Sequence, residues 1–324
     1  QIADGDVPGA SVQAASEAEE KIAMRIAITG TSGLVGSALT LFLESHGDEV
    51  FRIVRREAVR GAREIFWNPD RGEIQVEALE GMDALVHLSG ENVSEGGWTE
   101  EKKQRIYKSR VDSTRVLCDA LIRLERPPRV WVCASAIGYY GSRDDQELDE
   151  DSPPGKGFLT GVCLDWEAAT KPATEHGIRV VNLRIGVVLS PKGGAFPKMA
   201  APFRKGFGGV LGDGQAYMSW ISIVDLLEAI RFCILNDAIT GPVNAVAPNP
   251  VTNREFTQVL SRALSRPAIL PMPAFIIRLI LGEEKSRELL LASVRARPKR
   301  LLDAGFSFQH PDIGAAIQWI LRHG

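Results

Sequence analysis

A glycine-spaced loop near the start of the chain constrains its fold more than any other feature. The loop reads Gly30-Thr31-Ser32-Gly33-Leu34-Val35-Gly36 and follows a short apolar run, residues 25–29. Residues 34–46 then carry apolar side chains at helical spacing. In a strand, turn and helix of this kind, glycine lets the backbone approach a pyrophosphate, and the helix N-terminus offers it free amide groups. The loop therefore predicts a dinucleotide-binding site at the start of a βαβ unit.

Apolar runs and helical segments alternate along the first two thirds of the chain. We expect strands at residues 49–54, 64–67, 84–88, 129–134 and 179–184, and helices at residues 34–46, 100–124, 166–176 and 223–235. Mainly helical segments follow at residues 253–266, 274–282, 286–296 and 311–323, with prolines between them. The pattern predicts the α/β class, with a Rossmann-type doubly wound parallel sheet and a smaller helix-rich C-terminal lobe.

Three parts of the chain are expected to differ in role. Residues 1–23 are rich in Ala, Glu, Ser and Asp and predict a linker or disordered N-terminal extension. Residues 24–235 form the predicted Rossmann domain, and residues 236–324 the smaller substrate or C-terminal lobe, interleaved with residues 186–222. Because the chain opens with Gln1, we expect either a fragment or the loss of an upstream portion. An upstream domain and a second copy of the chain, in a homodimer, are the candidate protein partners.

Overall composition argues against several classes of partner. The net charge is -3 and the isoelectric point about 6.1, so we expect neither nucleic acid nor an anionic membrane as a partner. No run approaches the roughly 18 apolar residues of a membrane span. The four cysteines are scattered and the five histidines lack metal-ligand spacing, which predicts no metal and a reducing compartment, the cytoplasm.

Two arginines stand where a nicotinamide cofactor is discriminated. About 20 residues beyond the glycine loop, an acid binds the free ribose hydroxyls of NAD(H), whereas arginine accommodates the 2′-phosphate of NADP(H). Arg55 and Arg56 occupy that point, so NADP(H) is favoured over NAD(H). Alternatively, both arginines are solvent-facing at the end of a strand, and Glu57 contacts a ribose.

Several further motifs resemble one known family. The glycine loop resembles that of the extended short-chain dehydrogenases/reductases, and the remaining motifs resemble the branch of "epimerase family" proteins that ends in a domain of unknown function. The motifs are His87-Leu88-Ser89-Gly90-Glu91-Asn92, Trp98, Lys108-Ser109-Arg110, Ser135-Ala136-Ile137-Gly138-Tyr139-Tyr140-Gly141, Asp165-Trp166-Glu167, Leu183-Arg184-Ile185-Gly186-Val187-Val188-Leu189, Ser219-Trp220-Ile221 and Arg297-Pro298-Lys299-Arg300-Leu301-Leu302.

The resemblance implies roles for individual residues. It adds to the cofactor-binding set Leu88, Ser89, Gly90, Arg110, Ile185, Gly186 and Val187, with the first three along the ribose and the last three near the nicotinamide. Ser135 stands where the superfamily keeps a hydroxyl that hydrogen-bonds the reacting oxygen. The alternative for each is ordinary packing at a strand end.

One departure from the superfamily bears on catalysis. The superfamily relies on Tyr-x-x-x-Lys, in which lysine lowers the tyrosine pKa and orients the ribose. If Glu167 is the acid that follows this motif by four residues, Leu159 and Cys163 occupy the two positions. Tyr139 or Tyr140 is then the candidate catalytic hydroxyl, unless both pack beside the cofactor. Cys163 is a further candidate, against the alternative of a buried inert thiol.

A basic, glycine-rich segment offers a second candidate feature. Residues 192–214 contain Lys198, Arg204 and Lys205, which suits either a mobile lid over an anionic small-molecule substrate or a solvated loop.

Two functions fit these features. The first is an NADP(H)-binding oxidoreductase or nucleotide-sugar epimerase-like enzyme that lacks the Tyr-x-x-x-Lys pair. The alternative is a non-catalytic NADP(H)-binding redox sensor or regulatory protein.

Overall fold

The structure, a computed structural model, describes residues 23–324. The linker expected over residues 1–23 lies outside the described residues, apart from Ala23. None of the helices within residues 23–324 combines the length and the apolar character that a bilayer crossing needs.

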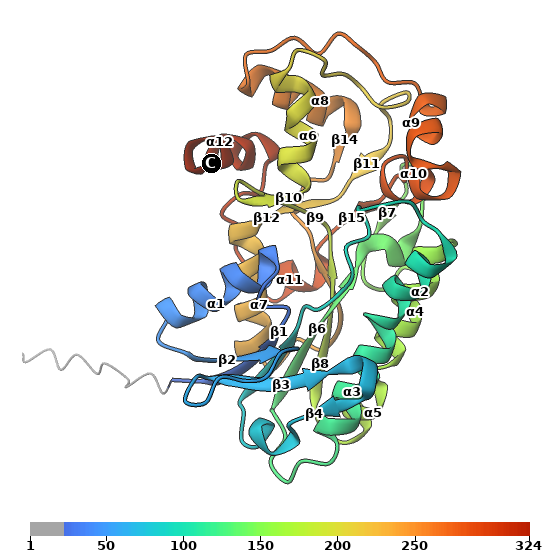
Figure 1. Ribbon diagram of the computed structural model, residues 1–324. Coiled ribbons are helices and arrows are strands. Elements are labelled where there is room, and N and C mark those ends of the chain that lie inside the picture. Colours follow the sequence, from blue (N-terminus) through green and yellow to red (C-terminus); the bar gives the residue numbers. More distant parts are fainter. Residues whose placement is uncertain (1–22) are drawn as a thin grey trace, which may run out of the picture.

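An eight-stranded sheet forms the centre of the larger lobe (Figure 1). Its strands are β1 (Arg25–Thr29), β2 (Glu49–Val54), β3 (Glu64–Asn68), β4 (Glu73–Ile74), β5 (Ala84–His87), β6 (Val130–Ala136), β8 (Arg179–Ile185) and β13 (Gly241–Ala245). They lie in the order β13-β8-β6-β5-β1-β2-β3-β4, and every pair except β3 with β4 is parallel. The predicted α/β, Rossmann-type class is confirmed.

The chain changes direction across this sheet between β1 and β5. It first runs outward through β2 and β3 and then returns to pair β5 with the other side of β1. At such a switch point the loops after neighbouring strands diverge, which leaves a crevice at the carboxyl ends of the strands.

Helices cover both faces of the sheet because successive side chains of each strand point to opposite faces. Ile26 and Ile28 pack on one face, and Ala27 between them packs on the other. The first face is covered by α1 (Leu34–Ser45), α7 (Ile223–Leu235) and α11 (Lys299–Asp303). The second is covered by α2 (Glu100–Lys108), α3 (Val111–Leu121), α4 (Phe158–Ala168) and α5 (Lys171–Glu175), with the short 3-10 turns η1 (Pro69–Arg71), η2 (Val76–Leu79) and η3 (Ile137–Tyr140) at strand ends.

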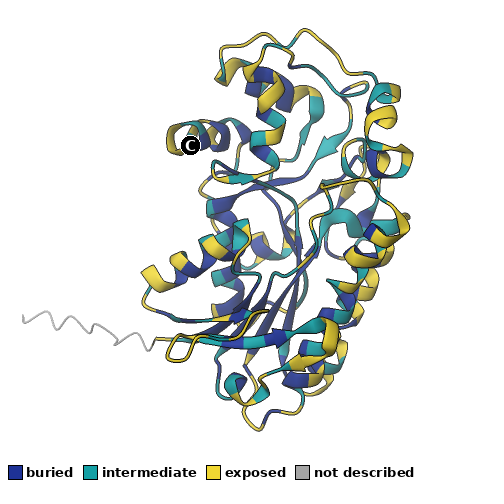
Figure 2. Cartoon of the chain, in the orientation of Figure 1, coloured by how far each residue is buried: buried dark blue, intermediate teal, exposed yellow. Residues whose placement is uncertain are grey.

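A smaller lobe sits beyond the carboxyl edge of the sheet, at the top of Figure 1. It contains β9 (Val187–Ser190), β10 (Gly193–Gly194), β12 (Trp220–Ser222), α6 (Ala195–Arg204), α8 (Asn253–Ala263) and α12 (Ile313–His323), with β11 (Tyr217–Met218) against β14 (Val251–Thr252). Phe196, Trp220, Phe256 and Ile317 are among the buried side chains of its own core, which appears as dark blue ribbon in Figure 2. The last elements are α9 (Ala274–Leu281), α10 (Glu283–Leu289), and β15 (Arg295–Ala296) paired with β7 (Glu147–Leu148).

Four local expectations were wrong. The helix expected over residues 100–124 is two helices, because the backbone turns at Ser109 and Arg110. The helix expected over residues 166–176 is instead the end of α4, which begins at Phe158, and the separate helix α5. Residues 290–296 are not helical, since Arg295–Ala296 pairs as a strand with β7.

The fourth wrong expectation is a mobile lid or solvated loop over residues 192–214, part of which is a packed helix. Residues 195–204 form α6, in which Phe196, Ala200 and Phe203 are buried in the core of the smaller lobe. Their i, i+4, i+7 spacing is helical, and the surrounding glycines had obscured it.

Candidate functional site

The glycine loop packs too tightly for side chains at two of its three glycines. Gly30 has φ +72°, and a Cβ on it would lie 2.9 Å from the carbonyl carbon of Leu88. A Cβ on Gly36 would lie 2.2 Å from the carbonyl oxygen of Gly30, whereas one on Gly33 would lie 3.3 Å from that oxygen. The backbone of Gly30-Thr31-Ser32-Gly33 is thereby held against both β5 and α1. No side chain caps α1 and its first turn holds no acidic residue, so its N-terminal amides are open to an anion.

A buried hydroxyl at the end of β1 fixes the neighbouring strand end. The Thr29 hydroxyl oxygen accepts hydrogen bonds from the backbone N–H groups of Leu88 at 3.0 Å and Ser89 at 3.3 Å, and it bonds His87 Nδ1 at 2.7 Å. Burial, with a smaller effect of the Arg110 charge, lowers the pKa of His87 to about 3. His87 is therefore neutral at physiological pH and supports the loop from inside.

The two candidate phosphate-binding arginines differ in their surroundings. Arg56 donates to both oxygens of Glu64, at 2.8 and 2.6 Å. The Arg56 hydrogen bond is the main reason that the pKa of Glu64 is lowered to about 2. Arg55 is exposed just beyond β2, beside the glycine loop, and has no hydrogen-bond or ion-pair partner within residues 23–324. Sequence reasoning treated the two as a pair, and the structure leaves only Arg55 free.

The other predicted cofactor residues line the same edge of the sheet. Leu88, Ser89 and Gly90 follow β5, and a Cβ on Gly90 would lie 3.1 Å from the guanidinium carbon of Arg110. Arg110 donates to the carbonyls of Glu91 and Ile106 and lies over the Trp166 ring. Because Gly90 has no side chain, the Arg110 guanidinium can pack against its backbone at this edge of the sheet.

Ile185, Gly186 and Val187 connect the two lobes. Ile185 ends β8 and pairs with Ala136 of β6, while Val187 begins β9. A Cβ on Gly186 would lie 2.7 Å from the carbonyl oxygen of Ser219. The structure thus brings this segment, the glycine loop and residues 88–90 to one edge of the sheet, and all of these assignments remain predictions.

A buried ion pair organises the end of β6. The Ser135 hydroxyl donates to Glu167 at 2.7 Å, and Arg184 donates to both oxygens of the same carboxylate, at 2.8 and 2.9 Å. Sequence reasoning used Glu167 only as an alignment marker and missed the role of Arg184. A charged residue inside the apolar run of β8 was the available signal, because a buried arginine needs a partner.

The two candidate tyrosines are placed differently around this pair. Tyr140 is fully buried, and its hydroxyl donates to Asn244 at 2.7 Å and accepts from Arg184 at 3.0 Å. Burial raises the pKa of Tyr140 to about 12. The Arg184 guanidinium lies 3.4 Å from the centre of the Tyr139 ring. Within residues 23–324 the Tyr139 hydroxyl has no hydrogen-bond partner, so it is the free phenol of the two.

Leu159 and Cys163 lie on α4, facing the turn that follows β6. Leu159 Cβ would be 3.3 Å, and Cys163 Sγ 3.8 Å, from a Cβ placed on Gly138. Cys163 is buried, and burial raises its pKa to about 12, so the group is a thiol at neutral pH. These two positions therefore hold neither the tyrosine nor the lysine of the superfamily motif.

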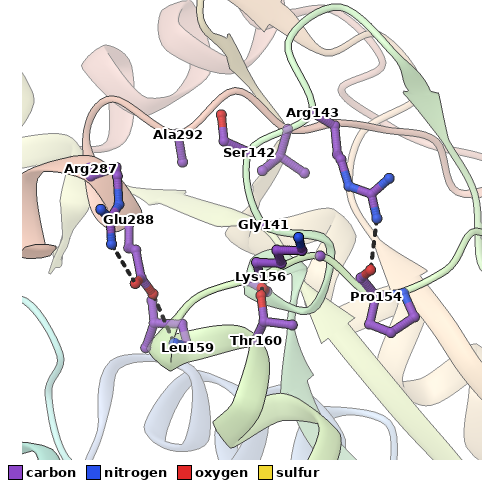
Figure 3. Close-up of a pocket in the computed structure, with 13 residues that line it drawn as sticks. Gly141, Ser142, Arg143, Pro154, Lys156, Leu159, Thr160, Arg287, Glu288 and Ala292 are labelled. Carbon is purple, nitrogen blue, oxygen red and sulfur yellow. Dashed lines mark hydrogen bonds and ion pairs between the residues drawn. The ribbon is translucent and has the colours of Figure 1, made fainter.

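A cavity of about 420 Å³ opens beside Leu159, between the two lobes (Figure 3). Its walls come from η3, from the loops before α4, from the first turn of α4 and from α10 with the segment after it. Glu288 of α10 accepts hydrogen bonds from the backbone N–H groups of Phe158 and Leu159, at 3.0 and 2.8 Å. Sequence reasoning missed this contact, because 130 residues separate Glu288 from Phe158.

The basic candidates of segment 192–214 lie on α6 or directly after it. Lys198 donates to the Ser94 hydroxyl at 3.1 Å, and Lys285, on α10, donates to the carbonyls of Ser94 and Gly96. Arg204 and Lys205 are exposed at the end of α6. Lys198 therefore ties α6 to the loop after β5. The described residues bring no three His, Cys, Asp or Glu side chains together as a metal site.

Comparisons with known proteins agree with this geometry. The model of the NAD dependent epimerase/dehydratase family matches residues 26–245, and that of a domain of unknown function, DUF1731, matches residues 272–320. The epimerase family protein Mb2239 of Mycobacterium bovis is 44% identical over 90% of this chain and 96% of its own length.

Solved structures extend the likeness. The human epimerase family protein SDR39U1, solved with NADPH, is 33% identical and has a TM-score of 0.85, covering 93% of this chain and 100% of that one. UDP-glucose 4-epimerase of Thermus thermophilus, solved with NAD, shares the fold at 18% identity, with a TM-score of 0.71 over 93% of this chain and 98% of that one. The chain belongs to the NAD dependent epimerase/dehydratase family, in the branch of epimerase family proteins whose C-terminal region is a domain of unknown function.

Proposed function

We propose that this chain binds NADP(H) at the switch point of its sheet. The loop from Gly30 to Gly36 would hold the pyrophosphate at the N-terminus of α1, and Arg55 would hold the 2′-phosphate. The guanidinium of Arg55, which has no partner within residues 23–324, carries the proposal, because an exposed cation beside the loop suits a phosphate better than a ribose diol. The NADPH in the solved human relative supports the same choice.

Equilibrium binding of the two cofactors to an arginine variant tests the proposal. Arg55→Ala should weaken NADPH binding by at least about tenfold, some 1.4 kcal/mol, and leave NADH binding unchanged. Arg60→Ala, at another exposed arginine of the same loop, serves as the control and should change neither affinity. Equal losses for NADPH and NADH in Arg55→Ala would refute the assignment.

We further propose that the bound cofactor serves hydride transfer to or from a carbonyl or alcohol carbon, as in a reductase or an epimerase. In the reducing direction NADPH would supply the hydride and the protein a proton to the reacting oxygen; in the oxidising direction NADP+ would accept the hydride and the protein the hydroxyl proton. Tyr139 is the candidate donor, because its hydroxyl has no partner among the described residues, whereas the Tyr140 hydroxyl bonds both Asn244 and Arg184. Ser135 would orient the oxygen once its hydroxyl proton, which is donated to Glu167 in this structure, turns to the substrate.

Oxidation of NADPH against a panel of carbonyl compounds and nucleotide sugars tests the chemistry. Tyr139→Phe should lower the turnover number by about 100-fold, the range that general acid catalysis contributes, with little change in NADPH affinity. An unchanged turnover number would remove Tyr139 from the mechanism.

A non-catalytic NADP(H)-binding protein is the second candidate. Leu159 and Cys163 support it: Leu159 has no acidic proton at the position of the superfamily tyrosine, and the neutral Cys163 thiol lacks the positive charge of the superfamily lysine. Tight NADPH binding without turnover of any panel compound would favour this candidate. For either function we propose a reducing, cytoplasmic setting, which the four free and buried cysteines support.

A further inference from the structure

We infer that the cavity between α4 and α10 binds the anionic end of a small substrate, a phosphate or carboxylate carried by a carbonyl compound, through Lys156 and Arg287. The inference rests on the proposed function, since it assigns the substrate class of the same site.

Charge in this cavity is out of balance. Three cations line it, Arg143, Lys156 and Arg287, against the single carboxylate of Glu288. Glu288 is committed to the two backbone N–H groups at the start of α4, and its contact with Arg287 is long, at 3.8 Å. Lys156 is exposed and has no hydrogen-bond or ion-pair partner in the described part of the chain. One ammonium and one weakly paired guanidinium therefore remain for an anion.

The third cation, Arg143, builds the wall instead. Its guanidinium donates to the carbonyls of Tyr140, Pro153 and Pro154, at 3.2, 3.1 and 2.7 Å. Figure 3 shows this arginine with Pro154 on one side of the cavity and Arg287 with Glu288 on the other, with Lys156 between them. Arg143 thus joins the loop after η3 to the loop before α4.

Hydrogen bonds between the lobes, and one within the larger lobe, hold the cavity open in one shape. The backbone N–H of Arg143 donates to the carbonyl of Ser293 at 2.8 Å, and the N–H of Ser293 donates to the Ser142 hydroxyl at 3.0 Å. Thr160 donates to the carbonyl of Gly138 at 2.9 Å. A cavity that is already ordered loses little conformational entropy when it binds a ligand, which favours binding of a small molecule.

Size and lining restrict what the cavity holds. About 420 Å³ lies near the lower end of the range for ligand sites, roughly 300–1,000 Å³. None of the 13 lining residues has an aromatic ring, so a nucleotide base has no aromatic stacking partner here. Leu159, Ala292 and Val294 instead offer apolar surface to a short carbon skeleton. The occupant is a small charged metabolite rather than the nucleotide half of a nucleotide sugar.

The cavity also reaches η3, the turn that carries Tyr139 and follows the strand that ends beyond Ser135. Gly138 lines it, three residues after Ser135 and directly before Tyr139. An anion held by Lys156 would therefore direct the remainder of a short molecule toward the turn that carries Tyr139. This reduces the entropic cost of orienting its carbonyl carbon for reaction.

Calorimetry on the whole chain saturated with NADP+, which cannot reduce an aldehyde, tests the inference. The probes are two matched pairs, glyceraldehyde 3-phosphate with glyceraldehyde, and succinic semialdehyde with butanal. In at least one pair the charged compound should bind at least tenfold more tightly than the neutral one, and the pair concerned identifies phosphate or carboxylate. Lys156→Glu and Arg287→Glu should each remove most of that difference. Lys171→Glu reverses the same charge on α5, away from the cavity, and should leave the difference intact.

Two results would overturn the inference. One is equal binding, or no binding, of the charged and neutral members of both pairs. The other is a charge preference that Lys171→Glu weakens as much as Lys156→Glu does. NADPH affinity, measured in parallel, separates the two proposals. Failure of the wild-type chain to bind NADPH would refute the proposed function. Normal NADPH binding without a charge preference would refute only this inference.

Discussion

Two parts of the carboxyl edge of the sheet differ in whether their polar groups have hydrogen-bond partners. At the ends of β1 and β2, α1 starts without a capping side chain and Arg55 has no partner among the described residues. At the ends of β6 and β8, the polar groups of Ser135, Glu167 and Arg184 satisfy one another. The first part leaves donors free for a ligand that the chain does not supply. The second is a closed network, which can hold a reacting group in place but offers few free groups of its own.

The largest predicted effect tests whether the network at β6 and β8 is structural. Glu167→Ala leaves the Arg184 guanidinium, whose side chain is 3% exposed, without its carboxylate. Removing one partner of a buried ion pair costs about 3–5 kcal/mol, so urea denaturation should show a loss of that size. Lys171→Ala, which breaks the exposed pair with Glu175, should cost less than about 0.5 kcal/mol. Similar losses in the two variants would mean that the network contributes little to stability.

The next prediction concerns the open part of the edge. Gly36→Ala would place a Cβ 2.2 Å from the carbonyl oxygen of Gly30, so the loop must move. NADPH affinity should fall by at least about 100-fold, roughly 2.7 kcal/mol, in fluorescence titrations. Gly33→Ala, with its Cβ at 3.3 Å from that oxygen, is the matched control and should lose far less. Equal losses would show that crowding of the loop does not govern binding.

The sequence could predict the open part of the edge almost completely. A strand, glycine turn and helix are local in sequence, and so is the arginine pair after the second strand. The sequence could not show that Glu64, on the adjacent strand, pairs with Arg56, whereas Arg55 has no partner within residues 23–324. Strand pairing decides that choice, because it brings β3 beside β2.

The closed part and the cavity depend on contacts that no local pattern encodes. Asn244 lies 104 residues from Tyr140, and Glu288 lies 129 residues from Leu159. The segment around α6 was misjudged for a related reason. Its glycines suggested mobility, whereas the packing of Phe196 and Phe203 against the smaller lobe fixes it.

A third prediction uses pH and the residue beneath the glycine loop. The pKa of His87 is about 3 in the folded chain, against about 6.5 when unfolded. Between these values the unfolded chain binds a proton that the folded chain does not, so stability is lost as pH falls from about 6.5 toward 3. His87→Gln should flatten the pH dependence of the unfolding free energy by about 1.4 kcal/mol per pH unit in that window. Parallel curves for the wild type and the variant would contradict the burial of a neutral His87.

The smallest predicted effect separates the two tyrosines. Tyr140→Phe removes the hydroxyl that bonds Asn244 and Arg184 and leaves the buried Asn244 oxygen without that donor. An unsatisfied buried acceptor costs about 1–2 kcal/mol, so the free energy of unfolding should fall by that amount, while turnover per folded molecule stays unchanged. Tyr139→Phe should show the reverse, with stability kept and turnover lost, because that hydroxyl has no partner within residues 23–324. If Tyr140→Phe instead abolished turnover without loss of stability, the network at β6 and β8 would have to open during the reaction, and the contrast between the two parts of the edge would hold only for the resting protein.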